Sequence, residues 1–207
     1  SRYQELKYPF RNAQAAAIES CRQLPLSFIW GPPGTGKTHT LGHIVAQLTS
    51  GDRPLRVLAL ATANRGIEQL LLKVDDAHAE LTGARPDLGD YLRTQVPKDE
   101  EFVNRPHLTA WSQLEDERVV TLNKIDTEES KLRSLHLISE DDTERQDLAE
   151  RLKAIKLERH ESIELYKSKR RALIDGAKAV FSSVNQHSWV MDIMGQHYDV
   201  VIFEEAS

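Results

Sequence analysis

Residues 31–38 have the sequence Gly-Pro-Pro-Gly-Thr-Gly-Lys-Thr, and this octapeptide limits the possible folds more than any other feature of the chain. It agrees with the phosphate-binding pattern G-x-x-x-x-G-K-[ST] at every fixed position. Glycine lets the backbone turn its N–H groups inward around phosphate oxygens, and a helix that begins at the loop adds the positive end of its dipole. The octapeptide therefore predicts a P-loop in an α/β fold, with a nucleoside triphosphate as its ligand.

The residues around the octapeptide fit a strand-loop-helix unit. Residues 26–30 (Leu-Ser-Phe-Ile-Trp) are apolar enough for a buried strand, with Trp30 packed behind it, and residues 38–48 favour a helix. In such a loop Lys37 reaches the β- and γ-phosphates, which makes it a predicted catalytic residue, and the Thr38 hydroxyl holds Mg²⁺. The predicted nucleotide-binding residues of the loop are Gly31, Pro32, Pro33, Gly34, Thr35, Gly36, Lys37, Thr38 and the residue at position 39, His39.

Length and composition restrict the rest of the chain. With 207 residues it is long enough for one domain with a sizeable core and an appendage. A net charge of −5 argues against a broadly basic surface, although a groove on an acidic protein can still be basic. The single cysteine, Cys21, excludes an internal disulfide, and no apolar run approaches the ~18 residues of a membrane span. Because the sequence does not begin with a signal-peptide pattern, it predicts an intracellular protein, cytoplasmic or nuclear.

Charge is concentrated in residues 113–172, which carry 28 of the 59 charged side chains, 15 acidic and 13 basic, and contain neither proline nor glycine. Apolar residues near heptad spacing predict two antiparallel helices, with a turn and a helix N-cap at residues 139–142. We therefore expect a helical, coiled-coil stalk over residues 111–173, inserted into an α/β domain of residues 1–110 and 174–207. The predicted seam residues are Leu114, Leu122, Ile125, Leu132, Leu135, Leu148, Leu152, Ile155, Tyr166 and Leu173.

The stalk has two interpretations. It is either a solvated support or a coiled coil that binds a protein partner, and the pattern favours the support. Lys167, Lys169, Arg170 and Arg171 form a basic cluster near its base. This cluster is a secondary candidate for nucleic-acid contact, beside the simpler interpretation of a solvated helix face.

Outside the stalk, short apolar segments alternate with helical patterns. Further strands are predicted at residues 56–62, 179–183 and 199–203. Apolar residues at helical spacing over residues 67–81 predict an amphipathic helix, so the whole pattern predicts a parallel sheet with helices on both faces. Ligands of such sheets bind beyond the carboxyl ends of the strands. The residues that follow predicted strand ends, and are expected to converge there, are Gly31, Thr62, Ser183 and the pair Glu204 and Glu205.

The carboxylate pair ends the last apolar strand. This arrangement is typical of a Walker B element, which positions Mg²⁺ and activates the attacking water. By chain order, Glu204 is the predicted magnesium ligand and Glu205 the predicted catalytic residue on the water side. A strand that ends in two acidic residues is weak evidence alone, but with a P-loop in the same chain it predicts nucleotide hydrolysis.

Four segments together resemble the first RecA-like domain of superfamily 1 helicases, in the branch that includes the nonsense-mediated-decay RNA helicase and its DNA-acting relatives. Residues 10–14 (FRNAQ) resemble the Q motif, and residues 61–70 (ATANRGIEQL) resemble motif Ia. Residues 180–183 (VFSS) are similar to the next strand with its Thr-Thr element, and residues 198–207 (YDVVIFEEAS) to the motif II strand. The resemblance covers nearly the whole chain, and family members carry a helical stalk between motifs Ia and II.

The resemblance implies an ATP-dependent helicase that acts on single-stranded DNA or RNA. Gln14 matches the glutamine that recognises adenine, so ATP with Mg²⁺ is the implied ligand. Thr62 and Asn64 in the motif Ia loop, and Ser183, are implied contacts to the nucleic-acid backbone.

The chain also departs from the family pattern. Glu204 replaces an aspartate and is one methylene longer, which predicts slower hydrolysis because Mg²⁺ demands strict octahedral geometry. Thr62 replaces the usual proline and Ala63 the usual serine or threonine, so one side-chain contact to nucleic acid is missing. The family's β-barrel ahead of the Q motif has no counterpart in this chain.

Motif II closes at Ser207, whereas the family continues into a second RecA-like domain that supplies arginine fingers. We therefore expect a fragment that binds ATP but hydrolyses it poorly, since an arginine finger contributes about 10³ to 10⁵ in rate. Two alternatives from other classes stay open. One is an AAA+ ATPase, which shares the GPPGTGKT loop, and the other is an ATP-regulated binding module that does not hydrolyse, suggested by Glu204.

Overall fold

The computed structural model describes residues 12–185, 193 and 195–204. The chain divides into two compact units. The first comprises Ser1–Trp111 and Leu173–Ser207, and the second comprises Ser112–Ala172. We refer to them as the α/β unit and the stalk, and each is described by itself.

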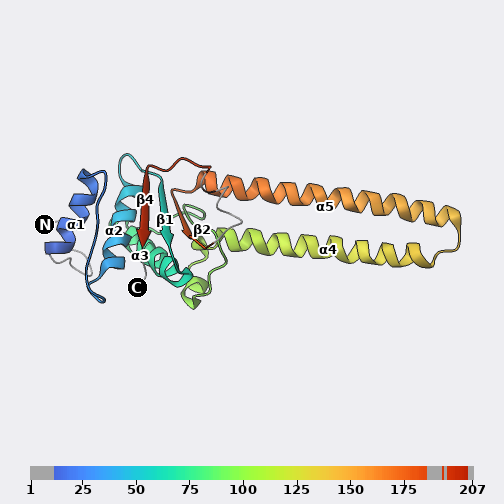
Figure 1. Cartoon of the computed structure of the whole chain (residues 1–207), viewed down its shortest axis with the longest axis horizontal. Coiled ribbons are helices and arrows are strands. Elements are labelled where there is room, and N and C mark those ends of the chain that lie inside the picture. The colour runs from blue at the N-terminus through green and yellow to red at the C-terminus, as the bar shows by residue number, and fades with distance from the viewer. Residues whose placement is uncertain (1–11, 186–192, 194, 205–207) are drawn as a thin grey trace. The chain divides into compact units, whose positions relative to one another are not determined.

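The α/β unit contains a four-stranded sheet in which every strand pairing is parallel. The strands are β1 (Val57–Ala61), β2 (Tyr91–Arg93), β3 (Ala179–Ser183) and β4 (Val200–Glu204). Their order in the sheet is β2-β3-β1-β4, so β1 lies between two strands that come more than a hundred residues later in the chain (Figure 1). In this register Ala61 is level with both Ser183 and Glu204, and three strands therefore end at one edge.

Side chains of successive strand residues point to opposite faces of the sheet. One face is covered by helices, and the other is covered except at β4, where Val201 and Phe203 are 60% and 56% exposed. Val57, Ala59 and Phe181 pack with the buried faces of α2 and α3 on one side. Leu58 and Val180 pack on the other side, with residues from the first turn of α4 and the last turns of α5. The helices and short 3₁₀ helices are α1 (Asn12–Gln23), α2 (Lys37–Ser50), α3 (Asn64–Thr82), η1 (Glu100–Asn104), η2 (Pro106–Leu108), α4 (Ala110–Ile138) and α5 (Asp142–Gly176). The predicted RecA-like α/β fold with a parallel sheet is confirmed.

One predicted strand is wrong. Residues 26–30 contain no strand, and Phe28 and Trp30 are each 89% exposed, so Trp30 does not pack behind a strand. An apolar run becomes a strand only where a neighbouring strand accepts its backbone hydrogen bonds, and no described strand pairs with this segment. The segment is fixed instead by Ile29, which packs against Ile18 of α1 and Ile44 of α2.

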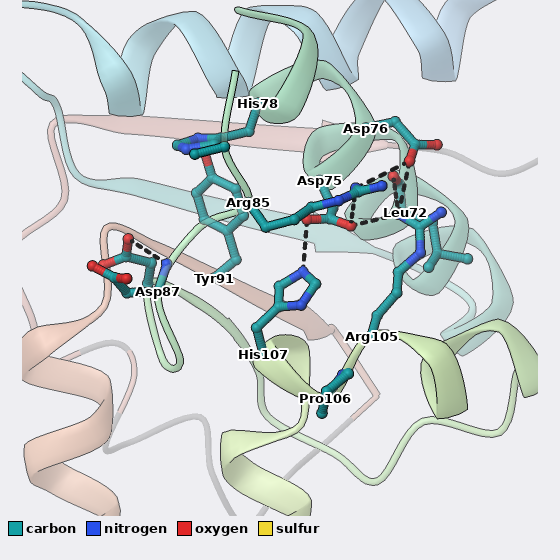
Figure 2. A network of polar contacts seen from close by, with 12 residues as sticks. Leu72, Asp75, Asp76, His78, Arg85, Asp87, Tyr91, Arg105, Pro106 and His107 are labelled. Atoms are coloured by element: carbon teal, nitrogen blue, oxygen red, sulfur yellow. Dashed lines mark hydrogen bonds and ion pairs between the residues drawn. The ribbon is translucent and has the colours of Figure 1, made fainter. Parts of the chain in front are cut away.

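A buried carboxylate fixes the segment that follows β2 to the middle of α3. Asp75 is fully buried and accepts hydrogen bonds from Arg85 (2.5 Å) and Arg105 (2.5 Å), while a His107 ring nitrogen lies 2.8 Å from its other oxygen. Figure 2 shows the three side chains converging on Asp75, with Asp76 beside it on α3. Together with the buried Phe102 and Leu108, which pack in the same core cluster as α3, these contacts hold η1 and η2 against α3.

The stalk consists of antiparallel α4 and α5 joined at residues 139–141. Asp141 caps α5, since its carboxylate accepts from the backbone N–H groups of Thr143 and Glu144. Most predicted seam residues are buried or partly buried, and Leu135, at 39%, is the most exposed of them. Among the described residues, no helix combines the length and apolar character needed to cross a membrane.

Candidate functional site

The P-loop runs directly into α2, which begins at Lys37. Gly34 and Gly36 have φ angles of 76° and 83°, a region that residues with side chains rarely adopt, so both glycines are required by the backbone. A Cβ atom on Gly36 would also lie 2.7 Å from the side-chain nitrogen of Gln14. The loop therefore has the conformation that places backbone N–H groups at the positive end of a helix dipole.

Lys37 bends back over the loop that precedes it. Its ammonium group donates hydrogen bonds to the carbonyl oxygens of Gly31 (2.6 Å) and Pro32 (3.1 Å). These two contacts hold a positive charge at the mouth of the loop, where phosphate oxygens of a bound nucleotide are expected.

Gln14 reaches the loop from α1. Its side-chain NH₂ group donates to the carbonyl oxygen of Thr35 at 3.1 Å, although 21 residues separate the two in sequence. The predicted adenine-contacting residue therefore lies against the P-loop. His39 follows on α2, and its ring meets that of His43 edge-on, with 4.8 Å between centroids.

The strongest link between separate parts of the site joins Thr38 to Glu204. The Thr38 hydroxyl donates to Glu204 Oε1 at 2.6 Å, although the two residues are 166 positions apart in the sequence. Glu204 is the last residue of β4 and is 9% exposed. Burial raises the pKa of its carboxyl group, while the Thr38 hydrogen bond and the Lys37 charge act in the opposite direction.

The second oxygen of Glu204 is an unsatisfied buried acceptor. Oε2 has no hydrogen-bond partner among the described residues, and a buried carboxylate oxygen left in this way is unfavourable. A hydroxyl and a carboxylate side by side next to a phosphate-binding loop are the oxygen ligands that Mg²⁺ uses. The residues at this position therefore fit the predicted magnesium site, with Thr38 and Glu204 as its ligands.

The predicted nucleic-acid contacts lie at the same edge of the sheet. Thr62 and Asn64 are exposed just after β1, and the Thr62 carbonyl accepts from the Asn185 side chain at 3.1 Å. Ser183, at the end of β3, is only 4% exposed. The register brings Ser183 level with Glu204, and Thr62 directly follows Ala61, the β1 residue that pairs with both. Glu205 lies outside the described residues.

Arg93 belongs to this edge and was not found from the sequence. It ends β2, is 1% exposed, and donates to Asn64 Oδ1 at 3.1 Å. Burial lowers the pKa of its guanidinium to about 10, with an opposing contribution from Glu68, so the side chain stays positively charged near neutral pH. The signal available in the sequence was a single arginine in a short apolar segment, Tyr-Leu-Arg, which is too short to identify a strand.

A family model described as an AAA domain matches residues 9–207. The chain belongs to this AAA domain family. The match covers the P-loop, the residues at the strand ends and Glu204 together, so the site described above lies within the span of a single domain match.

Three relatives indicate which kind of AAA domain the chain resembles. A putative regulator of nonsense transcripts 1 from Takifugu rubripes is 45% identical over 65 residues, which are 31% of this chain and 6% of the relative. The ATP-dependent helicase NAM7 of Saccharomyces cerevisiae is 40% identical over 65 residues, 31% of this chain and 7% of the relative. A regulator of nonsense transcripts 1 homolog from Drosophila melanogaster is 44% identical over 62 residues, 30% of this chain and 5% of the relative.

The matched segments thus span less than a tenth of the relatives' own length. Together with the family match they confirm the resemblance drawn from the motifs: this AAA domain is of the type found as the first RecA-like domain of superfamily 1 helicases, in the nonsense-mediated-decay branch. Its relatives favour a helicase motor domain over an AAA+ ATPase.

Proposed function

We propose that the chain is the ATP-binding first motor domain of a superfamily 1 helicase, which couples ATP hydrolysis to movement along, or unwinding of, single-stranded DNA or RNA. The observation that carries the proposal is the 2.6 Å hydrogen bond between Thr38 and Glu204. It joins the P-loop to the end of β4, which is the arrangement needed to hold a nucleotide and its metal ion at one place.

Each residue of the site has a defined task in this proposal. The loop N–H groups and Lys37 bind the phosphates, and Gln14 binds adenine, which favours ATP. Thr38 and Glu204 would hold Mg²⁺, which neutralises charge on the phosphate oxygens when bound. Glu205 orients the attacking water. Thr62, Asn64 and Ser183 contact the nucleic-acid backbone, which positions a strand without selecting its sequence.

Full activity requires a second RecA-like domain in this proposal, because such a domain supplies the arginine fingers in the helicases that the chain resembles. The stalk is an insertion over residues 111–173 into the α/β domain of residues 1–110 and 174–207, and it is either a solvated support or a docking site for a protein partner. An intracellular location, cytoplasmic or nuclear, stays a prediction from the sequence.

The test is steady-state ATP hydrolysis by the chain joined to a second RecA-like domain, with and without single-stranded DNA or RNA. We expect stimulation by at least one of the two nucleic acids. Lys37→Ala should reduce the stimulated rate by about 100-fold or more, since it removes the charge at the γ-phosphate. Lys153→Ala, an exposed lysine of the stalk, is the matched control and should leave the rate unchanged. Hydrolysis that neither nucleic acid stimulates would overturn the motor proposal.

A second candidate function is an ATP-regulated binding module that does not hydrolyse ATP. It is motivated by Glu204, whose extra methylene relative to aspartate moves the carboxylate further from the strand. The discriminating variant is Glu204→Asp. A large gain in ATP hydrolysis would support the view that glutamate holds the site in a slow state, and an unchanged rate would remove the motivation for this candidate.

A further inference from the structure

Arg93 is a buried charge beside the predicted nucleic-acid edge. A charged side chain that is 1% exposed is unfavourable unless its charge and its hydrogen-bond donors are satisfied. Glu68 of α3, itself 4% exposed, places a carboxylate oxygen 3.8 Å from Arg93 Nη2. The two charges form a buried pair between β2 and α3, and the pair lies directly behind the first turn of α3.

Arg93 donates every one of its hydrogen bonds through its two terminal nitrogens, while its Nε has no partner among the described residues. It donates to the backbone carbonyl of Phe181 (3.4 Å), to Gln95 Oε1 and to Asn64 Oδ1 (3.1 Å). An arginine side chain has five N–H donors and no acceptor. The Asn64 side chain must therefore turn its oxygen toward Arg93, because its NH₂ group would meet another donor in the opposite orientation.

The orientation of the Asn64 amide also decides that its NH₂ group, and not its oxygen, points away from Arg93. Asn64 is exposed at the start of α3, and its NH₂ group makes no hydrogen bond with the described residues, so this end of the amide is available to a ligand. Phosphate oxygens of a nucleic-acid backbone accept hydrogen bonds and do not donate them, so only the NH₂ end of an asparagine can bind them. The buried guanidinium thus selects the amide orientation that suits a phosphate.

We infer that Arg93 is a positioning residue for nucleic-acid binding, which acts by turning the amide of Asn64 so that its NH₂ group meets the phosphate backbone. The inference rests on the proposed function, because it takes Asn64 as a nucleic-acid contact. Arg93 does not touch the nucleic acid itself. Glu68 holds the guanidinium in place, and Asn64 transmits its effect.

The first test replaces Arg93 with methionine, which has similar length but no donors. Nucleic-acid-stimulated ATP hydrolysis is measured against the concentration of single-stranded nucleic acid. We expect the half-saturating concentration to rise about tenfold, the loss expected for one hydrogen bond to a charged group, with little change in the maximal rate. The KM for ATP without nucleic acid should not change. A loss of maximal rate with an unchanged half-saturating concentration would overturn the inference.

Arg93→Met alone leaves Glu68 buried without its partner, so the variant can lose stability for a reason unrelated to nucleic acid. The combined variant Arg93→Met with Glu68→Met removes both charges and restores an apolar interior. The inference predicts that it folds as well as the unaltered protein and keeps the tenfold defect. Normal half-saturation in this combined variant would contradict the inference, because the defect of the single variant would then be structural.

A double-mutant cycle with Asn64→Ala tests the route of the effect. If Arg93 acts through Asn64, Arg93→Met should add no further defect once Asn64 is alanine. An additive effect would contradict the inference. Lys178→Met is the matched control. Lys178 pairs with Asp90 (2.8 Å) where β3 and β2 begin, at the end of these strands opposite to Arg93. Loss of this pair should leave the half-saturating concentration unchanged.

The salt dependence of binding separates a positioning role from direct contact. A cation that touches a phosphate contributes about 0.7 to the slope of log K against log salt for a single strand. Arg93→Met should therefore weaken binding without changing this slope. A slope that falls by about 0.7 would assign Arg93 to the phosphate itself and overturn the inference. If neither nucleic acid stimulates the unaltered protein, that result counts against the proposed function, before any variant is compared.

Discussion

The α/β unit and the stalk are both rich in charge, but they use it in opposite ways. In the α/β unit Asp75, Glu68 and Arg93 are buried and held by specific partners. In the stalk, pairs such as Arg159 with Asp126 and Lys169 with Glu117 lie between exposed side chains. Water screens the second kind of pair and leaves the first kind dependent on its partners. The same residue types are therefore expected to matter greatly in one unit and little in the other.

Packing gives the largest expected difference between the two units. Leu71 of α3 is fully buried in the core beneath the sheet, and Leu132 of α4 is 4% exposed in a cluster of only a few leucine and isoleucine residues. We expect Leu71→Ala to lower the free energy of unfolding by about 4 kcal/mol and Leu132→Ala by about 2 kcal/mol, because two helices can close around a small cavity more easily than a sheet can. Urea denaturation measures both losses, and equal losses would contradict the expected difference in packing between the two units.

The next largest loss of stability is expected at Asp75, the buried carboxylate of α3. Asp75→Asn keeps the shape of the side chain but leaves Arg85, Arg105 and His107 facing a neutral amide (Figure 2). We expect a loss of about 3 kcal/mol, at the low end for a broken buried pair, since Arg105 keeps its contact with Asp76 at 2.9 Å. Thermal unfolding followed by circular dichroism measures the change. A loss below about 1 kcal/mol would mean that Asp75 behaves like a surface residue.

The pH dependence of stability tests a buried histidine of the α/β unit, His43 of α2. Burial, and after it the charge on His39, lowers the pKa of His43 from 6.5 to about 4, although Glu80 lies 3.5 Å away. The unfolded chain then takes up this proton first as the pH falls below about 6.5, so stability drops with falling pH until about pH 4. Between pH 7 and pH 5 the contribution is on the order of 2 kcal/mol. His43→Gln should remove this part of the pH dependence, and an unaltered profile would exclude His43 as its source.

The smallest effect is expected in the stalk. Asp126→Asn removes the partner of Arg159, at 2.9 Å across the two helices, by the same chemical change as Asp75→Asn. Both side chains are about half exposed, so the loss should stay below about 1 kcal/mol and should shrink in high salt. Urea denaturation at low and high salt measures it. A loss as large as that of Asp75→Asn would end the distinction between the two units.

Much of the fold could be predicted because local patterns and tertiary structure agree. The P-loop, β1, β3, β4 and the two stalk helices follow from composition and spacing, and the strand register brings Ser183 and Glu204 level as expected. The strand predicted at residues 26–30 was wrong because a strand needs a neighbouring strand to pair with. The apolar character of a segment does not reveal whether such a neighbour is available. β2 has only three residues, and no periodicity can be read from so short a segment.

The residues of the candidate site likewise divide into those that a sequence pattern identifies and one, Arg93, that it does not. Lys37, Thr38 and Glu204 could be predicted as site residues because a spaced motif and the chemistry of nucleotide binding point to them. Arg93 was missed because its role depends on being buried against Asn64 and Glu68, from separate segments of the chain, and burial of a lone arginine has no local sequence signal. Glu205 stays a prediction.

The most direct test of the account is the effect of Mg²⁺ on ATP binding, measured by calorimetry for the protein and for Thr38→Val and Glu204→Gln. The account predicts that Mg²⁺ tightens ATP binding, and that each variant loses this gain by about tenfold or more while it keeps its affinity for ATP alone. Both residues should behave alike, because a single hydrogen bond of 2.6 Å joins them at one site. A Mg²⁺ effect that survives in both variants would contradict the claim that the P-loop and the end of β4 form one nucleotide site.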